Sequence, residues 1–191
     1  MSEWSQNRDL GSGLSDLRSN EYPGRVAMMG IGLDGDIALQ AYAIMGRSEE
    51  SRDRIFVQDG TSIRTTAPRK TPEEMAATKN SNLIFYRALG SVGNVHVVSN
   101  GAQTDPILDD ILYGFSLEEA ARQAPTVKGT DLEDIDLAAY EPDSPNFTPR
   151  ITGVIDLRPS TPTPFGLAVV SKNQETGEPD YAVYTTDLDE L

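Results

Sequence analysis

The chain has 191 residues, no cysteine, one histidine and a formal net charge of −14. This length suits one domain with a substantial core, and the acidic balance repels polyanions, so we expect neither a nucleic-acid nor a membrane partner. Without cysteine the chain has no disulfides, thiolate nucleophiles or sulfur-ligated metals, and the single histidine, His96, rules out a two-histidine metal site.

The N-terminal region differs in composition from the rest of the chain. Residues 1–21 are rich in serine, asparagine, glycine and charge, with little periodic apolar content. We therefore predict a mobile tail over residues 1–21 and a single domain over residues 22–191. No stretch approaches the roughly 20 apolar residues of a membrane span, and the start of the chain lacks the apolar centre of a signal peptide. These features predict a cytoplasmic protein.

Two hairpins are predicted next along the chain. Each consists of two apolar runs around an Asp-Gly turn: residues 25–33 and 37–44 around the turn at 34–36, and residues 54–57 and 62–66 around the turn at 59–60. This pattern is a strong hairpin signal because glycine readily adopts the positive φ angles of tight turns. Two consecutive hairpins predict an antiparallel sheet.

Three helices are indicated by their starting residues. Thr71, followed by a proline and two glutamates, predicts a helix that runs toward Lys79, and Ser116 begins a second capping box. Asp105 and Pro106 are predicted to open a third helix, because the apolar residues that follow are spaced along one helical face.

The remaining segments are mostly strands. Residues 95–98 are predicted to form a strand that contains His96 as a structural residue, and three more strands are predicted over residues 150–156, 165–171 and 181–186. Residues 83–89 are ambiguous, and the acidic, proline-rich residues 125–149 are interpreted as an ordered loop or a short helix plus loop. Strands at both ends with helices between them predict an α+β layered fold.

Residues 46–54 gather three arginines and two serines in a strongly acidic chain. The guanidinium group presents a rigid fork of donors that matches phosphate or carboxylate oxygens, so the segment suits an anionic small molecule. A solvated loop of mixed charge is the alternative interpretation. Three further polar segments, at residues 22–25, 98–105 and 146–150, also have ordinary interpretations as turns or starts of strands.

Taken together, these segments resemble the monofunctional, archaeal-type inosine monophosphate (IMP) cyclohydrolases. The matching pieces are, in chain order, Tyr-Pro-Gly-Arg at 22–25, Gly-Arg-Ser and Ser-Arg-Asp-Arg at 46–54, Tyr86, Val-Ser-Asn-Gly at 98–101 with Thr104 and Asp105, and Tyr140-Glu141 followed by Asn-Phe-Thr-Pro-Arg-Ile at 146–151. The resemblance implies a four-layered αββα sandwich, like that of N-terminal-nucleophile hydrolases, with mostly antiparallel sheets.

The resemblance also implies a reaction. These enzymes close the purine ring of 5-formamidoimidazole-4-carboxamide ribotide with loss of water, in purine biosynthesis. Because the substrate carries both reacting groups, positioning and charge stabilisation suffice, and neither a metal nor an organic cofactor is expected. Family members tend to form oligomers, so we expect a homo-oligomer that binds a small purine nucleotide precursor.

The resemblance places Arg54, Tyr86 and Glu141 at the catalytic centre, with Arg52 as the alternative to Arg54. In these roles, the arginine neutralises the oxyanion, the phenol protonates the departing oxygen, and the carboxylate accepts the amide proton. The remaining substrate-binding candidates are assigned to the phosphate (Arg25, Arg47, Ser48 and Arg150) and to the ribose and carboxamide groups (Asn100, Thr104, Asp105 and Asn146). For Asp105, capping of its helix is an equal alternative.

Two other functions stay open at this stage. The chain can be a catalytically inactive purine-nucleotide-binding regulatory protein that keeps the pocket. It can also be an amidohydrolase with a nucleophile at the start of the mature chain, for which Ser2 is the candidate.

Overall fold

The computed structural model describes residues 15, 18–22, 24–32, 37–79, 81–128, 134–159, 161 and 163–186. Most of the predicted tail, including Ser2, and the predicted turn at 34–36 lie outside the described residues. The statements below concern the described part of the chain.

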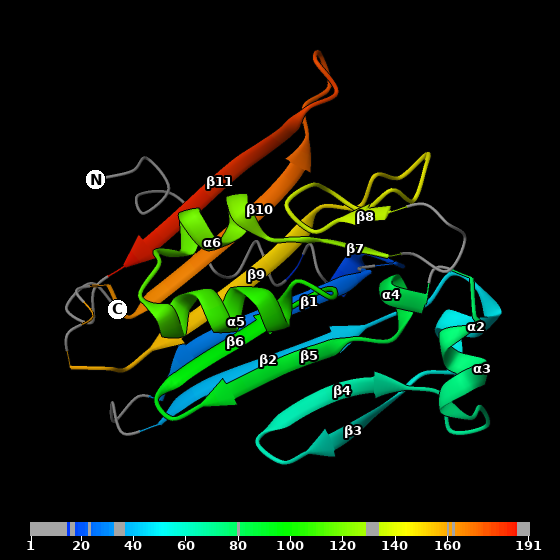
Figure 1. Ribbon diagram of the computed structural model, residues 1–191, viewed down its shortest axis with the longest axis horizontal. Helices are drawn as coiled ribbons and strands as arrows, with labels where there is room; N and C mark the ends of the chain where they lie inside the picture. The colour runs from blue at the N-terminus through cyan, green and yellow to red at the C-terminus, as the bar shows by residue number, and fades with distance from the viewer. Residues whose placement is uncertain are drawn as a thin grey trace.

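A seven-stranded antiparallel sheet forms the centre of the molecule (Figure 1). Its order is β11 (Pro179–Thr186), β10 (Phe165–Lys172), β9 (Arg150–Asp156), β6 (Val95–Ser99), β5 (Arg87–Val92), β4 (Ser62–Thr66) and β3 (Ile55–Asp59). The pairing of β6 with β9 joins the two halves of the chain, with Val97 opposite Val154 and both side chains buried. The strands predicted in these regions are therefore confirmed, and so is the second hairpin.

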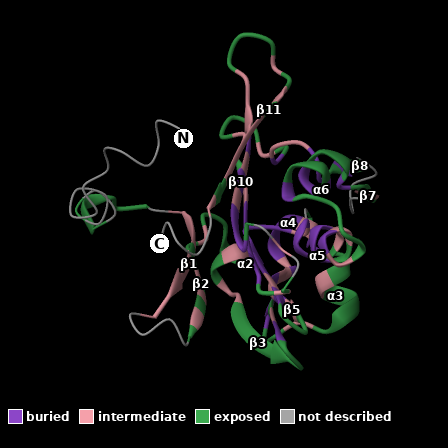
Figure 2. Cartoon of the chain, turned by 90° about the vertical axis from the view of Figure 1, so that its left-hand side faces the viewer, coloured by how far each residue is buried: buried purple, intermediate pink, exposed green. Residues whose placement is uncertain are grey.

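Two helices, α5 (Thr104–Tyr113) and α6 (Leu117–Gln123), cover one face of this sheet (Figures 1 and 2). The apolar face predicted for α5 is confirmed, because Ile107, Leu108 and Ile111 are buried in one cluster with residues of β6 and β9. Helix α6 begins after Ser116 with both hydrogen bonds of the predicted capping box.

The predicted first hairpin, β1 (Arg25–Ile31) and β2 (Ala38–Ile44), lies on the opposite face of the sheet (Figure 2). The approach is close at Gly153 in β9, where an added Cβ would lie 2.5 Å from the Sδ atom of Met29, so any larger residue would displace the Met29 side chain. The Gln40 side chain donates a hydrogen bond of 3.1 Å to the carbonyl of His96. The helices, the sheet and the hairpin therefore form three layers.

This arrangement confirms an α+β fold with mostly antiparallel sheets. The second helical layer of the αββα sandwich stays a prediction. No helix in the described part of the chain is long and apolar enough to cross a membrane.

Short elements at one end of the sheet differ from the sequence-based expectations. The arginine segment contains one helical turn, α2 (Glu49–Arg52), and the ambiguous run divides into α4 (Ser81–Ile84) and the start of β5. Helix α3 (Pro72–Ala76) has the predicted capping box but ends before Lys79.

The interpretation of residues 125–149 as a loop or a short helix plus loop is wrong in part. The described residues of this segment include a small antiparallel pair, β7 (Thr126–Lys128) and β8 (Asp134–Asp136). Ile135 and Leu137 alternate with polar residues and are buried against Leu83 and Ala124. Burial against a distant segment therefore stabilises strands that the weak local pattern does not predict.

Candidate active site

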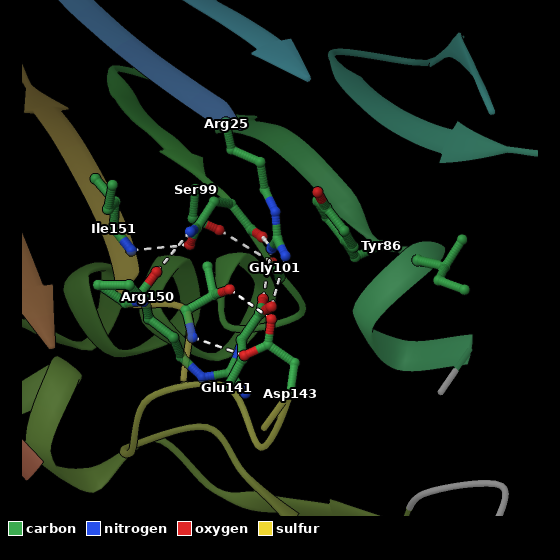
Figure 3. A network of polar contacts seen from close by, with 12 residues as sticks. Arg25, Tyr86, Ser99, Gly101, Glu141, Asp143, Arg150 and Ile151 are labelled. Carbon is green, nitrogen blue, oxygen red and sulfur yellow. Dashed lines mark hydrogen bonds and ion pairs between the residues drawn. The ribbon is translucent and has the colours of Figure 1, made fainter. Parts of the chain in front are cut away.

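Predicted site residues from distant segments meet at one end of the sheet (Figure 3). Arg25 begins β1, Tyr86 precedes β5 and Arg150 begins β9, while Glu141 belongs to the loop before β9. In antiparallel pairs the start of one strand lies beside the end of its neighbour, so residues far apart in the sequence share one edge.

An ion pair between Arg25 and Glu141 lies at the centre of this cluster (Figure 3). Both terminal nitrogens of Arg25 donate to the carboxylate, at 2.5 Å each, and one of them also donates to the carbonyl of Asn100. Glu141 is 0% exposed. Burial acts to lower the pKa of Arg25, but the hydrogen bond and charge of Glu141 outweigh it and the pKa is raised. Arg25 therefore carries a permanent positive charge, fixed in direction.

Arg150 supports the same carboxylate from a fully buried position. Its guanidinium lies 3.8 Å from the carboxylate of Glu141, donates to the carbonyl of Ala139 at 2.7 Å, and donates to Oε1 of Gln103 at 3.2 Å. Burial lowers the pKa of Arg150, and the charge of Glu141 opposes this effect. Two arginines thus share one buried carboxylate, which leaves a net positive charge in the cluster.

Gly101 leaves room for this network. A Cβ at position 101 would lie 2.6 Å from Oε1 of Gln103 and 2.9 Å from Nη1 of Arg150. Since both atoms belong to a buried and hydrogen-bonded pair, neither can move away without loss of a contact.

A pair of tyrosines lies beside the ion pair. The hydroxyl oxygens of Tyr42 and Tyr86 are 2.7 Å apart, and Tyr86 is only 6% exposed. Burial raises the pKa of both phenols. For Tyr86, the charge of Arg25, the hydrogen bond with Tyr42 and the charge of Arg54 act to lower the pKa. Both phenols are therefore protonated at neutral pH.

Arg54 is held near Tyr86 by backbone contacts. Its Nε donates to the carbonyl of Ser51 at 2.7 Å, and its Nη1 donates to the carbonyl of Ile84 at 3.2 Å. Burial lowers the pKa of Arg54, although the group stays charged.

A cleft of about 590 Å³ opens beside this cluster. It includes six of the predicted site residues, which are Arg25, Arg47, Ser48, Arg54, Glu141 and Asn146. Arg47 lies at its exposed side, where Nη2 is 3.3 Å from both Asp143 and Thr148. Tyr86 borders two smaller hollows of about 420 and 300 Å³ instead, and its hydroxyl oxygen lies 2.7 Å from that of Tyr42.

Other predicted residues lie in supporting or separate positions. The Asn100 side chain joins β6 to β9, because its Nδ2 donates to Pro149 and its Oδ1 accepts from the amide of Ile151. Thr104 is 0% exposed and donates to the carbonyl of Arg87 at 2.5 Å. Ser48, besides lining the cleft, caps α2.

Arg52 and Asp105 lie away from the cleft. Arg52 lines a separate hollow with Arg69 and Lys70, and Asp105 pairs with Arg87 at 2.9 Å. The alternative role of Asp105 as a helix cap is wrong, because α5 begins one residue earlier, at Thr104.

The residues that were not predicted from the sequence include Tyr42 and Gln103 in the cluster and Lys79 in the cleft. Tyr42 alternates with exposed residues of β2 and faces the sheet, a period-two signal that the sequence did contain. Gln103 has no comparable signal because its role depends on Arg150. Lys79 adds another positive charge to the lining of the cleft.

The fold and the cluster define an α+β protein with an arginine-rich cleft at one end of an antiparallel sheet. Within the described residues, no group of three or more histidine, aspartate or glutamate side chains is arranged to hold a metal ion. Residues 22–187 match the family model described as IMP cyclohydrolase-like protein, and the chain belongs to this family.

A curated relative has the corresponding name. The IMP cyclohydrolase of Natronomonas pharaonis is 31% identical over 116 residues, which cover 60% of this chain and 51% of that protein. The match thus spans about half the length of this relative.

Proposed function

We propose that the protein is an IMP cyclohydrolase, which closes the purine ring of 5-formamidoimidazole-4-carboxamide ribotide with loss of water. Membership of the family supports this proposal. The observation that carries it is the convergence of Arg25, Tyr86 and Glu141 beside an arginine-lined cleft.

The chemistry needs orientation and charge stabilisation more than a nucleophile. The carboxamide nitrogen of the substrate attacks the neighbouring formyl carbon, and the oxygen of the tetrahedral adduct gains negative charge. In this proposal the half-buried guanidinium of Arg54 stabilises that oxygen, and Tyr86 supplies the proton with which it leaves as water. Positioning of the two groups can supply about 7 kcal/mol of the barrier or more.

Glu141 contributes to this reaction through Arg25. Both carboxylate oxygens accept hydrogen bonds from Arg25, so acceptance of the amide proton requires Arg25 to release one of them. We therefore assign to Glu141 first the fixing of Arg25, and second the proton-accepting role in a substrate complex that breaks one contact.

The cleft suits the nucleotide part of this substrate. Its volume of about 590 Å³ lies within the usual range for small-molecule sites, about 300 to 1,000 Å³. Arg47 and Lys79 line it, and we propose that Arg47 and Ser48 bind the phosphate while Asn146 binds the ribose. We also propose that the protein has the four-layered αββα fold and that it forms a homo-oligomer.

A direct assay tests the function. Purified full-length protein is mixed with the formamido ribotide, and formation of inosine monophosphate is followed by absorbance. We expect turnover well above the buffer rate. Binding of inosine monophosphate without turnover would replace this proposal by the inactive regulatory protein, and loss of activity in Ser2→Ala would favour the amidohydrolase-type nucleophile.

A further inference from the structure

We propose that Tyr42 is a positioning residue for the reaction: it donates a hydrogen bond to the Tyr86 oxygen and so directs the Tyr86 proton toward the ligand. This inference rests on the proposed function. It is carried by the contact between the two phenols, which are 44 residues apart in the sequence.

Packing against two aromatic rings holds the Tyr42 ring between the hairpin and Tyr86. Tyr42 lies on β2 and faces the seven-stranded sheet, with its ring edge-to-face with Tyr86 at 6.5 Å and with Phe56 at 5.9 Å between ring centroids. Two aromatic neighbours leave the hydroxyl little freedom, and its recorded partner is the hydroxyl of Tyr86 at 2.7 Å.

Positive charges act on both phenols. The guanidinium groups of Arg25 and Arg54 both act on the Tyr86 phenol and stabilise its negative form. For Tyr42, burial and the neighbouring Tyr86 both raise the pKa and outweigh the effects of the same two arginines. The 2.7 Å contact permits either oxygen to donate, and we assign the donor role to Tyr42 because Tyr86 is its recorded partner.

This direction has a consequence for catalysis. Because the Tyr86 oxygen accepts a hydrogen bond from Tyr42, the O–H bond of Tyr86 points in another direction. Tyr86 can therefore donate its proton to a ligand. The attacking nitrogen gives one proton to the oxygen of the tetrahedral adduct, which becomes a hydroxyl group. When the C–O bond of the adduct breaks, the Tyr86 proton goes to this hydroxyl group, which leaves as water. The phenolate left on Tyr86 is stabilised by Tyr42, Arg25 and Arg54. The formamide nitrogen loses its proton as the C=N bond of the ring forms, and this proton restores Tyr86, so the reaction releases only water.

A double-mutant cycle separates positioning from general packing. Tyr42→Phe keeps the ring and removes the donor, and we expect kcat to fall by about 10- to 100-fold, the range for loss of a hydrogen bond to a developing charge. The Kd for inosine monophosphate should stay unchanged. In the Tyr86→Phe background the same change should have no further effect on kcat, whereas additive losses in the cycle would overturn the proposal.

A matched control and a conservative variant complete the cycle. Tyr181→Phe removes a hydroxyl that donates to the carbonyl of Ala138 at 2.6 Å, and we expect kcat to be unchanged. If Tyr42→Phe does not fold, 4-aminophenylalanine at position 42 keeps the ring and a weaker donor, and kcat should then be reduced at unchanged Kd. A kcat equal to that of the unmodified protein in this variant would contradict the assignment.

One measurement is independent of turnover. With ¹³Cζ-labelled tyrosine, the Tyr86 resonance is assigned by its absence in Tyr86→Phe and compared at neutral pH among the variants. We expect removal or weakening of the donor at position 42 to shift this resonance, and Tyr181→Phe to leave it in place. An unmoved Tyr86 resonance would overturn the role of Tyr42, whereas absence of turnover in the unmodified protein would overturn only the proposed function.

Discussion

The guanidinium of Arg25 and the carboxylate of Glu141 meet at two points, at 2.5 Å each, although 116 residues separate them in the sequence. Arg25 is the first residue of the hairpin layer, and Glu141 lies in the loop before β9. The pair therefore ties two layers together at the site, so we expect it to affect both stability and activity.

Glu141→Gln removes the charge and keeps the shape of the side chain. We expect the free energy of unfolding to fall by about 3 kcal/mol, because Arg25 and Arg150 are left without their shared carboxylate. We also expect kcat to fall more than the affinity for inosine monophosphate. Urea denaturation and steady-state kinetics check both effects.

The matched control for this prediction removes both charges. Arg25→Met combined with Glu141→Leu should recover part of the stability lost in Glu141→Gln, because Arg25 no longer stays buried without a partner, whereas Arg150 still lacks the carboxylate. Its activity should remain low. If the free energy of unfolding of Glu141→Gln equals that of the wild-type protein, the ion pair does not contribute to stability and the prediction is wrong.

Gly101→Ala introduces a methyl group into the buried network. We expect a loss of about 1–3 kcal/mol in the free energy of unfolding, because the new Cβ overlaps Gln103 and Arg150. Gly30→Ala is the control, since no atom lies within 4 Å of a Cβ there. Equal stability of both variants in urea denaturation would contradict the packing that we describe.

Arg47→Ala should chiefly weaken binding. The side chain lies at the exposed side of the cleft, and loss of a charge-assisted contact to a phosphate is expected to raise the Kd for inosine monophosphate by about 10- to 100-fold. Calorimetric titration measures this effect. Arg122→Ala, on α6, removes an arginine that pairs with Glu118 on the surface and should leave Kd unchanged.

The choice between Arg54 and Arg52 can be tested by kinetics. Arg54→Met should lower kcat by about 100-fold or more, the effect of losing one donor to an oxyanion. Arg52→Met should have a small effect, because Arg52 lines another hollow. The reverse order of effects would return the catalytic role to Arg52.

Alkaline pH should destabilise the protein through its buried phenols. The folded-state pKa values of Tyr42 and Tyr86 are raised above the ordinary value of about 10, so the folded protein holds these protons more tightly than the unfolded chain. Their contribution to stability is complete below about pH 10 and is lost as the pH rises further. Urea denaturation from about pH 9 to about 11 measures this loss of the free energy of unfolding. The loss should be smaller in Tyr42→Phe and unchanged in Tyr113→Phe, because Tyr113 is exposed.

Much of the fold could be predicted from local patterns. The two hairpins, the capping boxes at Thr71 and Ser116 and the apolar face of α5 each depend on residues within a few positions of one another. The β7 and β8 pair was missed because Ile135 and Leu137 are buried against residues from other parts of the chain. Local rules do not include such partners.

For the site, the sequence by itself determined which residue types are available: an acidic chain with clustered arginines, one histidine and no cysteine, in an order that resembles one family. Only the tertiary structure decided which of them meet. In the folded protein Arg25 pairs with Glu141, the hydroxyl of Tyr42 contacts that of Tyr86, and Arg52 lies away from the cleft. The reason is physical: segment motifs are local, whereas the charge and hydrogen bonds around a buried group come from every layer that packs against it.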